Sequence, residues 1–173
     1  MLESESHRLA RLLGRDRPHL TAETPPSRTL AIFNVDDVIR PIVTSHQVLQ
    51  RRVHWEPTGD VARGDADAMA EVINILVDNA ARHAPDSEIT VEVGRKAGSL
   101  EITVRDNGPG LPAEVRRRLF EWGGRGADSK GKGIGLYLAH QLVTTSGHSL
   151  RLDMNVSGTT FVIELPLLSE DLR

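Results

Sequence analysis

The sequence contains no cysteine, which excludes a disulfide framework, a thiolate metal site and a cysteine nucleophile. Its seven histidines never stand in an HxxxH or HExxH spacing, so the helical zinc site of a metalloprotease is excluded as well. No apolar run approaches the roughly 20 residues of a membrane-spanning helix, and no signal peptide is visible. We therefore expect a soluble, cytoplasmic polypeptide.

The chain also lacks a strong charge of either sign, since its formal net charge is −3. This gives no electrostatic reason to expect nucleic acid as a partner. A length of 173 residues with 39% hydrophobic and 26% charged residues is typical of one globular domain with a short appendage. We predict an amphipathic helix and linker over residues 1–28, a domain over 29–168 and a tail over 169–173.

Hydrophobic periodicity predicts alternating strands and helices within this domain. Asn34 or Asp36 is expected to cap the first helix, and Asp65 the long second one. The expected fold is an α+β two-layer sandwich, with helices on one face of a mixed sheet of about five strands. Strands are predicted at 29–33, 52–56, 88–93, 100–104, 149–154 and 160–165, and further helices at 113–120 and 135–144.

The first segment of interest is residues 70–85, AEVINILVDNAARHAP. Its apolar residues recur every three or four positions, which predicts a helix with one buried side. Asn79 and Arg82 lie three residues apart and can face one ligand together. An amide oxygen can complete a Mg²⁺ shell and a guanidinium can hold phosphate, although an ordinary amphipathic helix would carry the same pattern.

Two glycine-containing segments follow. In DNGPG, residues 106–110, the glycines allow backbone to approach a ligand closely, and Asp106 can accept a hydrogen bond from an exocyclic amine. In GKGIGL, residues 131–136, alternating glycines before a helix suit phosphate. Residues 126–132 begin like a P-loop, but Gly133 stands where that motif needs a hydroxyl. The dinucleotide fingerprint is not matched either, because the spacing is G-x-G-x-G.

A fourth segment, GTTF at residues 158–161, leads into the last predicted strand. NxAxRH, DNGPG, GKGIGL and GTTF, in this order, together resemble the N, G1, G2 and final boxes of the GHKL (HATPase) superfamily. Within it, the chain looks like the catalytic and ATP-binding domain of a bacterial two-component sensor histidine kinase. The resemblance implies the Bergerat fold, ATP and Mg²⁺ as ligands, and residues 1–28 as the end of a dimerisation and phosphoacceptor helix with its linker.

The resemblance also implies roles for residues of the long helix. Asn79 would bind Mg²⁺, Arg82 would contact phosphate, and the ring of His83 would lie beside the nucleotide. Glu71, two turns before Asn79, occupies the position of an acidic or amide residue and would act with Asn79 in catalysis.

Further implied roles fall on the glycine-containing segments. Asp106 would bind the adenine amine, Gly108 and Gly110 would shape the adenine pocket, and Thr159 would help to bind the base. Phe120 would open the lid over the nucleotide, and Gly131, Gly133 and Gly135, followed by Leu136, would form its hinge and phosphate-facing end. At least one of Arg125, Lys130 and Lys132 would meet the outer phosphates, and the sequence does not say which.

Two departures from the family pattern qualify the implied activity. Ile75 stands four residues before Asn79, where sensor kinases usually carry Asn and the gyrase- and Hsp90-type ATPases carry a catalytic Glu, so hydrolysis of the gyrase kind is not expected. His7 lacks the acidic neighbour of a phosphoacceptor histidine. We therefore expect a histidine kinase (ATP:protein-L-histidine phosphotransferase) domain that does not autophosphorylate by itself.

The expected partners are the phosphoacceptor domain of the same kinase, a homodimer in the full-length protein, and a response regulator. That full-length protein could be anchored in the inner membrane. The alternatives are a serine kinase of the anti-sigma kind and an interaction module that has lost nucleotide binding.

Overall fold

Five strands form one mixed sheet in the computed structural model, which describes residues 30–96, 98–122, 134–154 and 157–166. The strands are β2 (Val53–Trp55), β4 (Ile89–Lys96), β5 (Ser99–Asp106), β6 (Ser149–Asp153) and β7 (Thr159–Pro166). Their order is β2-β4-β5-β7-β6. The β2–β4 pair is parallel and the other pairs are antiparallel, which confirms the predicted mixed sheet.

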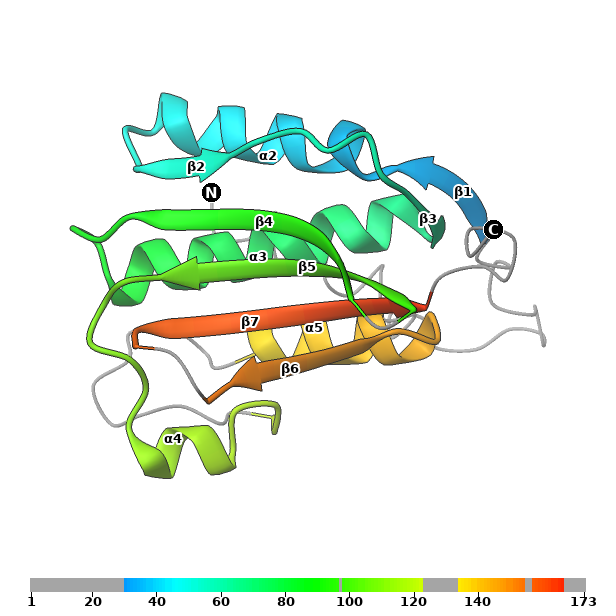
Figure 1. Cartoon of the computed structure of the whole chain (residues 1–173). Helices are drawn as coiled ribbons and strands as arrows, with labels where there is room; N and C mark the ends of the chain where they lie inside the picture. Colours follow the sequence, from blue (N-terminus) through cyan, green and yellow to red (C-terminus); the bar gives the residue numbers. More distant parts are fainter. Residues whose placement is uncertain (1–29, 97, 123–133, 155–156, 167–173) are drawn as a thin grey trace, which may run out of the picture.

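The longer helices are α2 (Val35–Val48), α3 (Ala66–His83) and α5 (Gly135–Thr145), and α4 (Ala113–Arg117) is short. In Figure 1, α3 and α5 lie behind the five-stranded sheet. Alternate residues of β5, such as Ile102 and Val104, are buried and belong to the same core as Leu76 of α3, as expected for a sheet with one covered face. The predicted α+β fold is therefore confirmed.

Side chains cap the N-termini of α2 and α3, which pack against each other. Asn34 Oδ1 accepts a hydrogen bond from the backbone N–H of Asp36 at 2.8 Å, and Asp65 Oδ1 accepts one from Ala68 at 3.0 Å. Asn34 is thus the cap of α2. Asp36 instead accepts from the backbone N–H groups of Thr58 and Gly59, so this buried carboxylate holds the turn after β2 against α2.

The structure differs from the predicted elements in two places. Residues 61–64 form a strand, β3 (Val61–Gly64), which pairs antiparallel with β1 (Ala31–Asn34) in a separate two-stranded sheet. No strand was predicted there because four residues after a Pro- and Gly-containing turn carry too short a pattern. The helix predicted over 113–120 ends at Arg117, since the chain then turns to bury Leu119.

Among the residues that the structure describes, no helix is both long and apolar enough to span a bilayer.

His148 lies where the turn after α5 meets the two-stranded sheet. A Cβ built on Gly64 of β3 would approach His148 Nε2 to 2.8 Å, with the Phe33 ring next nearest. Both ring nitrogens are buried and have no hydrogen-bond partner within the described ranges. This burial lowers the pKa of His148 from its ordinary value of 6.5, because a charged ring loses its hydration there.

We expect His148 to make the domain sensitive to acid. Its pKa is lower in the folded than in the unfolded state, so the unfolded chain binds more protons as the pH falls below about 6.5. The free energy of unfolding therefore decreases as the pH falls from the unfolded-state pKa toward the lower folded-state pKa of His148. Chemical unfolding of wild type and His148→Leu between pH 7.5 and pH 5 measures this, and the variant should show the smaller loss. His54→Leu, on an exposed residue of β2, is the control and should keep the wild-type loss.

Candidate functional site

The α3 helix separates an apolar stripe from a polar edge. Val72, Ile73, Leu76, Val77 and Ala80 are buried. Glu71 and Asn79 are half-buried on the other side, while Arg82 and His83 are exposed at the end of the helix. Asn79 makes no side-chain hydrogen bond within the described part of the chain.

Asp106 and Thr159 meet although 53 residues separate them. They are paired in the register of β5 and β7, and both residues are buried, at 5% and 7% exposure. Asp106 Oδ1 accepts hydrogen bonds from the backbone N–H groups of Gly108 at 2.9 Å and Thr159 at 3.4 Å. Since Oδ2 has no partner within the described residues, it remains an acceptor for a ligand amine.

The Gly108 backbone brings this turn against the end of α3. A Cβ on Gly108 would lie 2.5 Å from Ala84 Cβ and 2.9 Å from Asp106 Oδ1, so only glycine fits at this position. Gly110 packs in the same way against the Gly158 carbonyl. The segments containing Asp106 and Thr159 are thereby joined to each other and to the helix that carries Asn79.

The side chain of Ile75, on α3, faces the beginning of α5. Its Cγ2 is 3.4 Å from the position that a Cβ on Gly135 would take, and Ile75 and Leu136 both pack against the core while partly buried. The side chain that departs from the family pattern thus forms an apolar contact beside the predicted phosphate-facing helix end.

Aromatic contacts pack residues 119–122 against α5. The Phe120 ring stacks on His140, with centroids 4.8 Å apart, and meets the edge of Phe161. Trp122 makes an edge contact with Tyr137. Phe120, predicted at the opening of the lid, therefore lies at the sheet–α5 junction. Gly135 and Leu136, predicted beside the lid, begin α5. The other residues predicted in the lid lie outside the described residues: Arg125, Lys130, Gly131, Lys132 and Gly133.

An open cavity of about 310 Å³ lies beside the glycine turn. It touches Gly108, Gly110 and Thr159 but no residue of α3, and its other walls come from α4 and the β6–β7 connection, including Arg116 and Met154. The cavity thus borders three of the predicted adenine-pocket residues, Gly108, Gly110 and Thr159, but its lining includes neither Asp106 nor Asn79.

Within the described ranges, no group of three or more His, Asp or Glu side chains is arranged to hold a metal ion.

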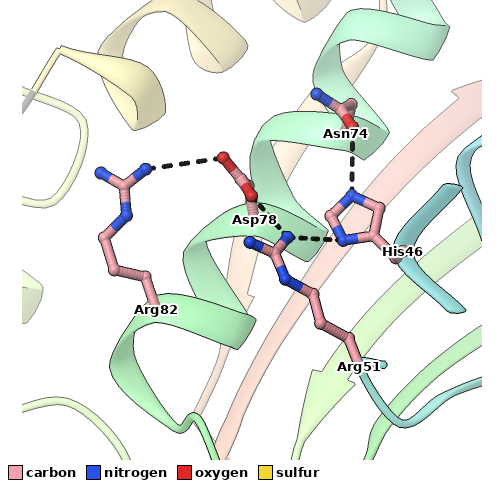
Figure 2. Close-up of polar contacts among 5 residues, drawn as sticks. All are labelled: His46, Arg51, Asn74, Asp78 and Arg82. Atoms are coloured by element: carbon pink, nitrogen blue, oxygen red, sulfur yellow. Dashed lines mark hydrogen bonds and ion pairs between the residues drawn. The ribbon is translucent and has the colours of Figure 1, made fainter. Parts of the chain in front are cut away.

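A polar network that the sequence did not reveal lies along α3 (Figure 2). Arg51 Nη1 donates to Asp78 Oδ1 at 2.6 Å and to His46 Nδ1 at 2.7 Å. His46 Nε2 lies 3.1 Å from Asn74 Oδ1, and Asp78 Oδ2 lies 3.5 Å from Arg82 Nη2. The Asp78–Arg82 spacing of four was a visible signal. No sequence pattern pointed to Arg51, because its contact partner Asp78 lies 27 residues away in the chain.

Residues 64–169 match the family model described as histidine kinase-, DNA gyrase B- and HSP90-like ATPase. This segment covers more than half of the chain and includes all four motifs. The chain belongs to this family.

Relatives of this ATPase-family domain are sensor kinases. The sensor protein kinase CarS of Pseudomonas aeruginosa is 31% identical over 173 residues, covering 96% of this chain and 37% of CarS. The solved mycobacterial sensor histidine kinase MprB is 26% identical with a TM-score of 0.65, covering 80% of this chain and 97% of the MprB chain. The resemblance to a sensor histidine kinase catalytic domain is confirmed.

The full-length ShkA structure, in complex with AMPPNP, shares the fold. Its TM-score is 0.69 at 20% identity, covering 95% of this chain and 36% of ShkA. The ATPase-family domain spans less than half the length of the curated sensor kinases it matches.

Proposed function

We propose that this domain binds Mg²⁺-ATP and donates the γ-phosphoryl group to a histidine on the dimerisation domain of a sensor histidine kinase. The observation that carries the proposal is the buried Asp106 carboxylate. One of its oxygens is held by backbone N–H groups, and the other has no partner within the described residues. An acceptor fixed in this way suits the amine of adenine and opposes the carbonyl that guanine presents there.

The α3 edge supplies the groups for metal and phosphate in this proposal. Asn79 would hold Mg²⁺ through its amide oxygen, together with water and phosphate oxygens, and the metal would neutralise charge on the transferred group. Arg82 would contact phosphate, and Glu71 and His83 would lie along the same edge. Phosphoryl transfer needs the acceptor histidine in line with the γ-phosphate, so the phosphoacceptor domain completes the reaction. A response regulator is the proposed recipient of the phosphoryl group.

Calorimetric titration with ATP, ADP and GTP, with and without Mg²⁺, tests the binding step. Adenine-selective binding in the micromolar range supports the proposal, while absence of binding under every condition overturns it and favours an interaction module. Transfer is tested by mixing this domain and labelled ATP with the separately produced phosphoacceptor domain of the same kinase. Phosphohistidine is the expected product, and phosphoserine would favour the anti-sigma type.

Ile75→Asn should strengthen Mg²⁺-dependent ATP binding. The substitution places a second amide about 40° around the helix from Asn79, where it can support the metal shell, and it removes only a partly buried side chain. We expect a gain of about three- to tenfold in ATP affinity with Mg²⁺, because the added amide is one more oxygen ligand for the metal shell. Calorimetry with Mg²⁺ and with chelator measures it.

Ile75→Leu, which keeps the apolar contact, is the matched control and should bind ATP as wild type does. An equal gain in the presence of chelator would contradict a role at the metal.

A further inference from the structure

Asp78 places a negative charge directly before Asn79 and on the same helix as Arg82. Its Oδ2 lies 3.5 Å from Arg82 Nη2. If phosphate binds to Arg82 as proposed above, this carboxylate opposes binding in two ways. It repels the phosphate charge, and it competes with phosphate for the Arg82 guanidinium.

Arg51 offsets this charge from the other side. Its contact with Asp78 Oδ1 is 2.6 Å long, much shorter than that of Arg82 with Oδ2. A single nitrogen, Nη1, makes this contact and also donates to His46 Nδ1. Arg51 is therefore held in place from two directions, as Figure 2 shows.

The buried ring of His46 fixes this arrangement. A guanidinium can only donate hydrogen bonds, so Nδ1 of His46 must accept from Arg51. The ring proton then lies on Nε2 and is donated to Asn74 Oδ1. Because His46 is 3% exposed and both of its nitrogens have partners, Arg51 is anchored to α2 as well as to α3.

We propose that Arg51 is a positioning residue for the nucleotide phosphates: by holding the Asp78 carboxylate, it leaves the Arg82 guanidinium available to phosphate. The side chains of the tight pair are the less exposed ones, at 32% for Arg51 and 37% for Asp78. The Arg82 side chain is 60% exposed. Among the described residues, Arg82 keeps only the long contact, which phosphate can replace. The inference rests on the proposed function, since it requires phosphates near Arg82.

The proposal predicts a dependence on phosphate charge. Without Arg51, the uncompensated Asp78 carboxylate draws Arg82 closer and repels the ligand. Arg51→Ala should weaken ATP binding about three- to tenfold at low salt, weaken ADP binding less, and leave adenosine binding unchanged. The difference should shrink as salt is raised, because screening weakens exposed charges.

The test is a double-mutant cycle with Arg51→Ala and Asp78→Asn. ATP and ADP are measured by calorimetry, and adenosine by nuclear magnetic resonance titration. Asp78→Asn alone should bind ATP as tightly as wild type or more tightly, and the double variant should recover the affinity lost in Arg51→Ala. Recovery distinguishes removal of a charge effect from damage to the fold.

Arg151→Ala is the matched control. It removes the same charge and an ion pair of similar length, Arg151–Glu101 at 2.9 Å, from the strands β6 and β5. It should leave all three affinities unchanged. The proposal is overturned if Arg51→Ala binds ATP like wild type, if the adenosine affinity falls equally, or if Asp78→Asn restores nothing. A wild-type domain that binds no nucleotide overturns the proposed function instead, and this inference with it.

Discussion

Asp106→Asn should lower the affinity for ATP about 100-fold, because a buried acceptor for the adenine amine becomes a donor. The two backbone N–H groups that point at Oδ1 of Asp106 will bind the amide oxygen of the new Asn. Its NH₂ group must then occupy the place of Oδ2 and face the adenine amine. Two donors face each other, and the hydrogen bond is replaced by a clash of like dipoles.

The same geometry predicts that the fold survives. The amide oxygen of the new Asn still accepts the hydrogen bonds from the backbone N–H groups of Gly108 and Thr159. The β5–β7 register therefore persists. Calorimetric titration with ATP and GTP measures the expected result, together with the unfolding midpoint. The ratio of ATP to GTP affinity should fall, since guanine presents a carbonyl that the amide NH₂ can serve.

Glu92→Gln is the control for Asp106→Asn. It makes the same change of charge on an exposed residue of β4 and should alter neither affinity. Wild-type ATP affinity in Asp106→Asn would show that Asp106 does not contact the base.

Gly158→Ala should cost the domain more than about 3 kcal/mol of unfolding free energy, because backbone strain and a steric clash coincide. Gly158 has a φ of +82°, and a Cβ there would lie 2.0 Å from the carbonyl oxygen of Asp106. The clashing atom is backbone, which cannot rotate away. The variant must therefore separate the end of β5 from the start of β7, and nucleotide binding should be lost as well.

Alanine substitutions at two other glycines separate the contribution of backbone strain from that of the steric clash. The free energy of unfolding of each variant is measured with urea. Gly98 has a φ of +88° but open space around it, and Gly94 has neither a positive φ nor a near neighbour. Gly98→Ala should cost about 1 kcal/mol from backbone strain alone, and Gly94→Ala close to nothing. If Gly158→Ala costs no more than Gly98→Ala, the turn around Asp106 is looser than the structure shows.

The elements with long periodic patterns were predictable from sequence. The α3 helix begins after its predicted cap Asp65 and buries the predicted stripe, because eighteen residues repeat the apolar spacing several times. The paired motifs around Asp106 and Thr159 were recognised together as parts of one site, and the structure pairs these two residues in adjacent strands. Their roles in binding ATP remain predictions, as do those of Asn79 and Arg82.

The features that sequence could not supply depend on contacts between distant segments. β3 has four residues and is defined by its pairing with β1, so its local pattern was too short to indicate a strand. The Arg51–Asp78 ion pair joins two segments that become neighbours only when α2 packs on α3. Neither composition nor spacing distinguishes Arg51 from Arg52, which is exposed.

The separation of the two sheets has a mechanical consequence. The chain enters the described domain through β1, which pairs with β3 over four residues, whereas β5 and β7 pair over eight. Tension applied to the N-terminal side of β1 therefore loads the short pair first. The strands that present Asp106 and Thr159 belong to the other sheet, so a pull or twist arriving from the preceding segment can be absorbed at β1 without shearing the register of the candidate site.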